Sequence, residues 1–144
     1  MPERTEIRTI MTEAVFSVDY YDPISKAENL MKREMIRHIP VTHDRKYVGM
    51  ITQQKINEYN LKRIYDYDSN EVPDENILIS DYRRIFVSDL PLIFPEDSIK
   101  KATELMVKHK VDVLPVVDWH KNLVGIITSI DLLLFFHKML SGKN

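Results

Sequence analysis

Thr128 and Asp131 lie three residues apart, directly after an apolar, β-branched run that ends at Ile127. Such a run is typical of a buried strand, and the residues from Ser129 onward favour a helix. A helix that begins where a strand ends gathers unpaired backbone N–H groups and the positive end of its dipole at one point. We therefore expect residues 128–131 to attract an anion or a ribose phosphate.

The same pair of residues also has a purely structural explanation. A threonine followed three residues later by an acidic residue forms a capping box, which stabilises the start of many helices. Capping and ligand binding are compatible, and this short spacing alone does not decide between them.

The stretch around these residues occurs twice in the chain. Residues 113–133 read VLPVVDWHKNLVGIITSIDLL, and residues 38–56 read HIPVTHDRKYVGMITQQKI. Pro40 and Pro115 are 75 positions apart, whereas Thr52 and Thr128 are 76 apart, so the second turn is one residue longer. Five apolar residues upstream match five others at a separation of 75 positions. They are Ile24, Ala27, Leu30, Met31 and Ile36, which match Ile99, Ala102, Leu105, Met106 and Val111. The chain is therefore an internal duplication.

Each repeat is predicted to fold in the order β-α-β-β-α, which gives an α/β fold class of the α+β type. Asp22 and Asp97 are expected to cap the first helix of each repeat. The predicted division is residues 1–65 for the first repeat with an N-terminal arm, 66–84 for an acidic linker, and 85–144 for the second repeat. The linker is interpreted as a solvated loop, with a docking segment for a basic partner as the alternative.

Composition excludes several classes of function. The net charge of −2 argues against a nucleic-acid-binding protein, which would carry a basic stripe. The 144 residues include no cysteine, so disulfides and thiolate metal sites are excluded, and the five histidines lack metal-ligand spacing. No Ser-His-Asp set or phosphate-binding glycine loop is evident, so we expect no enzyme. The polar N-terminus and the short apolar runs indicate a cytoplasmic protein without membrane association.

Taken together, the duplicated apolar-Pro-Val strand and the Gly-apolar-apolar-Thr sequence before a helix resemble a tandem pair of CBS domains, or Bateman module. The resemblance covers roughly residues 7–60 and 85–140 and is strongest in VLPVVD and GIITSID. It implies two repeats packed with pseudo-two-fold symmetry into a disc. It also implies a regulatory, nucleotide-binding role, in which an adenosine ligand such as AMP, ADP, ATP or S-adenosylmethionine occupies a cleft between the repeats. No cofactor is expected to be required.

The resemblance assigns roles to individual residues of the second repeat. Its motif is complete from Gly125 to Asp131, with the aspartate on the ribose hydroxyls and Thr128 near phosphate oxygens. A carboxylate suits the ribose because it accepts hydrogen bonds from both hydroxyls. The further ligand-binding residues implied by the resemblance are Ile126 in the motif, with Met11, Phe16, Ile36, Arg37 and His38 from segments of the first repeat.

The first repeat departs from the family motif. Thr52 is present, but Lys55 stands where the aspartate is expected, and an ammonium group cannot accept a hydrogen bond from ribose. This second cleft is therefore expected to be empty or to hold a more anionic group. Lys55 is either an ordinary surface lysine or a contact for phosphate.

The last helix, residues 129–140, is apolar around more of its circumference than one packing face needs. We therefore expect a homodimer formed through the helices, with those of Leu30 and Leu105 contributing. Two functional hypotheses follow. The chain either senses an adenosine compound, or serves as a ligand-free dimerisation or docking module that regulates an unknown partner protein.

Overall fold

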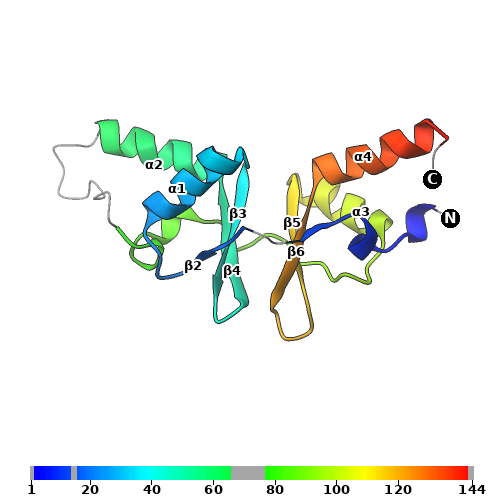
Figure 1. Ribbon diagram of the computed structural model, residues 1–144, viewed down its shortest axis with the longest axis horizontal. Coiled ribbons are helices and arrows are strands. Elements are labelled where there is room, and N and C mark those ends of the chain that lie inside the picture. The colour runs from blue at the N-terminus through cyan, green and yellow to red at the C-terminus, as the bar shows by residue number, and fades with distance from the viewer. Residues whose placement is uncertain (1, 14–15, 66–76, 143–144) are drawn as a thin grey trace. The chain divides into compact units, whose positions relative to one another are not determined.

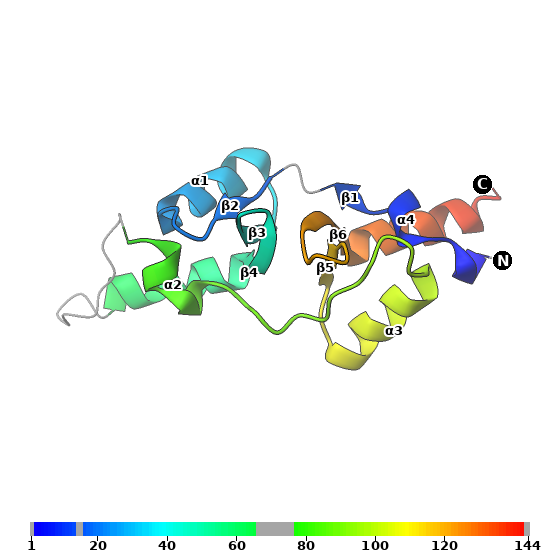
Figure 2. The same cartoon turned by 90° about the horizontal axis from the view of Figure 1, so that it is seen from below.

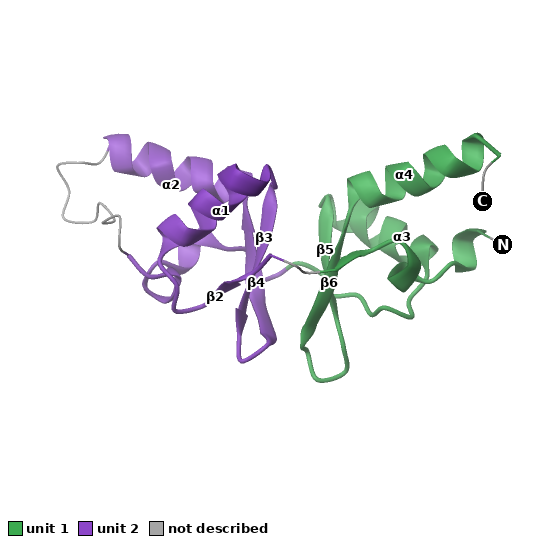
Figure 3. Ribbon diagram, in the orientation of Figure 1, with its two compact units in different colours: residues 1–15, 90–144 green, residues 16–89 purple. Residues whose placement is uncertain are grey.

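The computed structural model describes residues 2–13, 16–65 and 77–142. It divides into two compact units, one formed by residues 1–15 with 90–144 and the other by residues 16–89 (Figure 3). Each unit contains a three-stranded sheet and two α-helices (Figure 1). Within the described ranges, no helix has the length and apolarity needed to cross a membrane.

The unit of residues 16–89 contains the first repeat. Its sheet has the order β2-β3-β4, with β2 parallel to β3 and β3 antiparallel to β4. A tight turn at Asp44 and Arg45, both with positive φ, joins β3 to β4. The elements in chain order are β2 (Val18–Asp19), α1 (Ile24–Glu34), β3 (His38–His43), β4 (Lys46–Thr52), α2 (Gln53–Tyr65), and the 3-10 turns η3 (Ile79–Asp81) and η4 (Arg83–Ile85).

The other unit contains the second repeat and the N-terminal arm. Its sheet has the order β1-β6-β5, and both pairings are antiparallel. The first strand expected for this repeat is reduced to a bridge between Ile93 and Val116. The elements are the 3-10 turns η1 (Pro2–Arg4) and η2 (Ile7–Thr9), β1 (Thr12–Glu13), α3 (Ile99–His109), β5 (Val113–Val117), β6 (Leu123–Thr128) and α4 (Ser129–Leu140).

The cores of the two units confirm the duplication. The predicted apolar faces of α1 and α3 are buried at matching positions, and each packs against the hairpin of its own unit. Both hairpins also carry a register shift at the same place, between Val41 and Thr42 and between Val116 and Val117. The matched buried residues are Ile24, Ala27 and Met31 in α1 and Ile99, Ala102 and Met106 in α3.

The predicted aspartate caps are wrong. The N-cap of α1 is Pro23, which has no capping side chain, and that of α3 is Ser98, whose hydroxyl accepts the Lys101 N–H at 3.1 Å. Asp22 and Asp97 instead close the preceding turns, where their carboxylates accept backbone N–H groups three residues earlier, at 2.8 Å in both cases. A short acidic side chain before a helix can satisfy either the turn or the helix, and here the turn prevails.

Each unit completes its sheet with a segment that passes over a glycine. In one unit β1 pairs with β6 so that Glu13 lies opposite Gly125, and a Cβ added there would lie 2.8 Å from the Thr12 carbonyl oxygen (Figure 2). In the other, Val87 bridges Met50, and a Cβ at Gly49 would lie 2.4 Å from the Phe86 ring. Both glycines are thus required for close approach of a neighbouring segment.

These edge segments cross the predicted domain boundaries. Sequence order predicts that the arm belongs to the first repeat, yet it is part of the unit of residues 90–144, and residues 77–89 are part of the first-repeat unit. Ile77 packs on that core and Ile79 is fully buried, so this end of the predicted linker is part of a folded unit. The acidic part of the predicted linker, residues 66–76, lies outside the described residues.

Replacing Gly125 by alanine is expected to lower the free energy of unfolding by about 1–3 kcal/mol, because the added Cβ must displace the backbone of the arm. Urea denaturation followed by circular dichroism measures the change. Gly142→Ala is the comparison, since no atom lies within 4 Å of its added Cβ and only the strain of its positive φ, about 1 kcal/mol, is expected. An unchanged midpoint for Gly125→Ala would contradict the close approach.

Candidate functional site

Asp131 is the centre of a polar cluster at the start of α4. Its Oδ2 accepts hydrogen bonds from the Thr128 backbone N–H at 2.9 Å and from the Thr128 hydroxyl at 3.2 Å. The Asp131 N–H in turn donates to the Thr128 hydroxyl oxygen at 3.4 Å, which completes the predicted capping box. Thr128 and Asp131 therefore cap the start of α4, and Oδ2 of Asp131 is largely occupied by this capping role.

Thr12 of the N-terminal arm joins this cluster, although no motif in the sequence identifies this residue individually. Its hydroxyl donates to the Asp131 carboxylate, and the Thr12 Oγ1 lies 3.2 Å from Oδ1 and 3.4 Å from Oδ2. The two residues are 119 positions apart and meet because β1 pairs with β6, where Thr12 lies opposite Ile126. The only available signal was its place beside Met11, since a strand of two residues carries no periodic pattern.

Two further predicted residues, Met11 and Ile126, lie beside the same cluster. Met11 is partly buried on the core of this unit, and its Sδ is 3.1 Å from the position of a Cβ on Gly125. Ile126 is half-exposed in the middle of β6. The structure therefore brings four predicted residues together within one unit: Met11, Ile126, Thr128 and Asp131.

The first repeat holds half of the same motif. The Thr52 hydroxyl oxygen accepts the Lys55 backbone N–H at 3.2 Å, as Thr128 does for Asp131. The Lys55 side chain cannot complete a capping box, and its ammonium lies 3.5 Å from Glu58 Oε2. The position that pairs like Thr12 is taken by Val87, which has no hydroxyl. This unit therefore lacks counterparts of both the carboxylate acceptor of Asp131 and the hydroxyl donor of Thr12.

Backbone hydrogen bonds place Arg37 and His38 beside Thr52. The Arg37 carbonyl accepts the N–H of Gln53, the first residue of α2, at 3.0 Å, and His38 lies opposite Thr52 in the hairpin. The second repeat has the equivalent bond from Ser129 to the Asp112 carbonyl at 2.9 Å. The Arg37 side chain is exposed. Each helix start is thereby fixed to the residue that precedes its own hairpin.

Phe16 and Ile36 have a different environment. Both are partly buried and pack against the core of the 16–89 unit. Phe16 lies shortly before β2, and Ile36 lies shortly after α1. Ile36 follows Met35, which ends α1 in the left-handed conformation at φ 54°. Six of the predicted residues therefore belong to this unit: Phe16, Ile36, Arg37, His38, Thr52 and Lys55.

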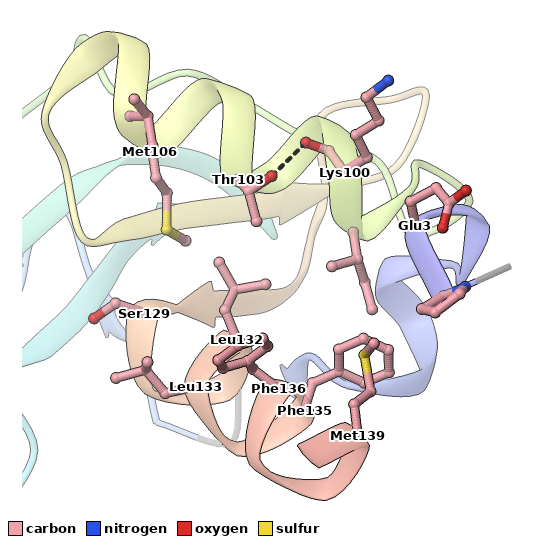
Figure 4. Close-up of a pocket in the computed structure, with 13 residues that line it drawn as sticks. Glu3, Lys100, Thr103, Met106, Ser129, Leu132, Leu133, Phe135, Phe136 and Met139 are labelled. Atoms are coloured by element: carbon pink, nitrogen blue, oxygen red, sulfur yellow. Dashed lines mark hydrogen bonds between the residues drawn. The ribbon is translucent and has the colours of Figure 1, made fainter.

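The apolar helix α4 borders a groove that it shares with α3. The groove has a volume of about 590 Å³ and is lined mainly by apolar side chains, which project from both helices in Figure 4. None of the twelve residues of α4 is buried, and Leu133 and Phe136 are 59% and 53% exposed. The predicted excess of apolar surface on this helix is confirmed.

No cluster of three or more histidine, aspartate or glutamate side chains that could hold a metal ion occurs among the residues that the structure describes.

The model of the CBS domain family matches residues 7–62 and again residues 79–138. These two segments make up most of the chain, so the protein belongs to the CBS domain family and contains two CBS domains in tandem. It is 30% identical over 128 residues to the CBS domain-containing protein YhcV of Bacillus subtilis (strain 168), a match that covers 89% of this chain and 83% of that protein.

Other curated relatives are longer enzymes. The chain is 25% identical over 133 residues to a homoserine O-acetyltransferase of Methanosarcina acetivorans, covering 92% of this chain but only 22% of that enzyme. The chain therefore spans less than a quarter of the length of such relatives.

Solved structures confirm the predicted fold of the CBS pair. Protein MJ1225 of Methanocaldococcus jannaschii superposes with a TM-score of 0.78 at 26% identity, over 94% of this chain and 49% of that one. CBSX2 in complex with AMP gives 0.75 at 17% identity, over 93% and 97% of the chains. The CBS domain pair of protein MJ0100, in complex with 5′-methylthioadenosine and S-adenosyl-L-methionine, gives 0.74 at 20% identity, over 94% and 98%.

A double-mutant cycle tests the link between the arm and α4. Thr12→Val removes the hydroxyl donor, and Asp131→Ala removes its acceptor. We expect a coupling free energy of about 0.5–1.5 kcal/mol between the two substitutions, measured by urea denaturation, because the pair forms a hydrogen bond that either change breaks. Strictly additive effects would show that the bond contributes nothing to stability.

Proposed function

We propose that this protein is a regulatory module that senses an adenosine-type compound, with AMP, ADP, ATP and S-adenosylmethionine as the candidate ligands. The observation that carries the proposal is the carboxylate of Asp131, which Thr128 orients at the N-terminus of α4 within one unit. Membership of the CBS family and the adenosine compounds in the complexes of CBSX2 and MJ0100 support it.

The two oxygens of Asp131 have different capacities for a ligand. Oδ2 accepts two bonds from Thr128, whereas Oδ1 accepts only the Thr12 hydroxyl at 3.2 Å among the described contacts. Hydroxyl-to-carboxylate bonds of full strength are about 2.5–2.7 Å long. A ribose hydroxyl can therefore replace or join Thr12 at Oδ1 while Thr128 keeps the carboxylate oriented. The dipole of α4 favours phosphate nearby.

The remaining contacts are proposed from the family resemblance. Met11 and Ile126 are proposed to meet the ligand beside Asp131, together with Phe16 and Ile36. Arg37, His38 and Thr128 are proposed to face its phosphate. Thr52 is kept in the first repeat, but Lys55 stands in place of the aspartate and cannot accept a hydrogen bond from ribose, so we propose one adenosine site per chain. Lys55 is proposed as a contact for additional phosphate groups.

Transmission of the signal is proposed to use α4 itself. The first turn of α4 carries Asp131, and the rest of the same helix borders the apolar groove with α3. A ligand that changes the hydrogen bonds at the first turn acts on a rigid element whose far side is exposed and apolar. We propose that this side forms a homodimer, through which ligand binding alters the assembly.

Ligand binding is expected to raise the melting temperature, because a ligand that binds only the folded state stabilises it by about 2.7 kcal/mol at a hundred-fold excess over Kd. A screen of AMP, ADP, ATP, S-adenosylmethionine and 5′-methylthioadenosine identifies the compound. Asp131→Ala is then expected to weaken its binding about ten- to a hundred-fold in calorimetry, because the ribose loses its charged acceptor.

Thr12→Val is the matched control for that experiment. It breaks the same link between arm and helix but leaves the carboxylate in place, so its affinity is expected to equal or exceed that of the wild type. Equal affinity in wild type and folded Asp131→Ala would refute the ribose assignment. Absence of any thermal shift with all five compounds would favour the alternative function.

The alternative is a ligand-free dimerisation or docking module, and the exposed apolar face of α4 favours it. Leu133, Phe136 and Leu140 are 59%, 53% and 71% exposed, and few polar groups interrupt the groove. Contiguous apolar surface of this kind usually marks an interaction site. This hypothesis shares the homodimer with the first one and differs in requiring no nucleotide.

Sedimentation equilibrium at micromolar concentration is expected to give a dimer. Phe136→Glu is expected to shift the protein toward monomer, because a buried carboxylate without a partner opposes association. His137→Glu is the control, since this neighbouring residue is exposed and does not line the groove. A monomeric wild-type protein, or equal dissociation of both variants, would contradict an interface at this groove.

A further inference from the structure

A second, polar pocket lies on α2 in the unit of residues 16–89. Its volume is about 320 Å³, and it opens between α2 and the segment that leads to Phe86. Three cationic side chains line it, together with aromatic rings and a single carboxylate, that of Glu58. The lining residues are Lys55, Glu58, Tyr59, Lys62, Tyr82, Arg84 and Phe86.

One wall of this pocket is an insertion that the other unit lacks. Leu78 bridges Pro23 as Glu6 bridges Ser98, so Leu78 and Glu6 are equivalent, and Phe86 and Met11 are equivalent because each lies over its glycine. Phe86 is eight positions after Leu78, whereas Met11 is only five after Glu6. The three extra residues, 82–84, form most of the additional turn η4 and supply Tyr82 and Arg84 to the pocket.

The charges in the pocket are also specific to this unit. Lys55 stands where the second repeat has Asp131, and the residue equivalent to Glu58 is Leu134. Only Lys62 has a cationic counterpart, Lys138, at the same spacing of 76 positions. Because the other unit folds in the same way without a counterpart of Lys55 or Glu58, the scaffold does not require these two charges.

Within the described contacts, the cations are only partly neutralised. Lys55 lies 3.5 Å from Glu58, the one acidic residue of the lining, and this pair is partly exposed. The ammonium of Lys62 lies 5.9 Å from the centre of the Tyr82 ring, a cation–π contact that holds the charge over the pocket wall without cancelling it. The formal charge of the lining is therefore three positive groups against one negative group.

We propose that this pocket binds the phosphate or pyrophosphate group of a small phosphorylated metabolite, with Lys55, Lys62 and Arg84 as its contacts. An arginine and two lysines around a small polar space suit a multiply charged oxyanion, because the guanidinium offers paired donors and the ammonium groups add charge. The volume is at the lower end of the range for small-molecule sites, which favours a compact ligand over a macromolecule.

The site is separate in its residues from the adenosine site on Asp131, apart from the proposed role of Lys55. It would let a phosphorylated compound act on α2 as the adenosine compound acts on α4. Lys55 is therefore left unchanged in all variants, so that each of the two proposals is tested independently of the other.

Calorimetric titration of the full chain with inorganic phosphate and with pyrophosphate tests the proposal. We expect one site per chain, tighter binding of pyrophosphate, and weaker binding at high salt. Arg84→Gln and Lys62→Gln are each expected to reduce affinity about five-fold, the loss of one partly exposed charge contact. Lys138→Gln, the equivalent lysine of the other unit, is expected to leave binding unchanged.

Asp131→Ala separates this site from the adenosine site, because it should weaken binding of the adenosine compound about ten- to a hundred-fold yet leave pyrophosphate affinity unchanged. The proposal is overturned if neither anion binds at millimolar concentration, if Lys138→Gln weakens binding as much as Lys62→Gln, or if binding depends on Asp131. Melting curves of each variant establish that it is folded before titration.

Discussion

Both units depend on the close passage of one chain segment over a glycine. At Gly125 the segment is the arm around Met11 and Thr12, and at Gly49 it is the stretch of Phe86 and Val87. The absence of a Cβ lets the segment complete the sheet edge, where backbone groups would otherwise lack partners. The same contact sets Thr12 beside Asp131 and sets η4 beside α2. Each candidate site therefore exists because its glycine admits a neighbouring segment.

The two units show how one scaffold supports opposite electrostatics. In one, a carboxylate at the first turn of the helix receives a hydroxyl from the edge segment. In the other, the carboxylate is replaced by Lys55 and the hydroxyl by Val87, while the threonine cap and the bond from the helix start to the preceding carbonyl are kept. The structural part of the motif is thus conserved within the chain, and only the groups available to a ligand differ. The site of each unit is consequently expected to prefer a different chemical group.

Much of the fold follows from the sequence because its signals are local and occur twice. The spacing of Ala27 and Met31, matched by Ala102 and Met106, predicts the buried helix faces, and the shift from 75 to 76 positions predicts the longer second hairpin turn. The exact helix starts are less predictable, since an aspartate such as Asp22 can bond to the turn before it as readily as to the helix after it.

The features that the sequence did not predict are those that depend on distant pairing. Thr12 reaches Asp131 only through a two-residue strand, which has too few residues to show alternation. The insertion at residues 82–84 is recognised only from the structure, because the bridges of Leu78 and Glu6 show that these two residues are equivalent in the two units. For the candidate site, the predicted motif residues meet at α4, whereas their threonine partner on the arm had to come from the structure.

The arrangement of edge segments has a consequence for how such a gene can be divided. A polypeptide that stopped at residue 65 would lack Ile79, Ile85 and Phe86, which belong to the core of its own unit, and would carry an arm whose partner strand is missing. Neither half of the coding sequence therefore encodes a self-sufficient folding unit. Each unit is therefore completed by a segment that the chain order attaches to the other repeat, whereas the ligand-facing groups of the two repeats can differ, as Lys55 and Asp131 do.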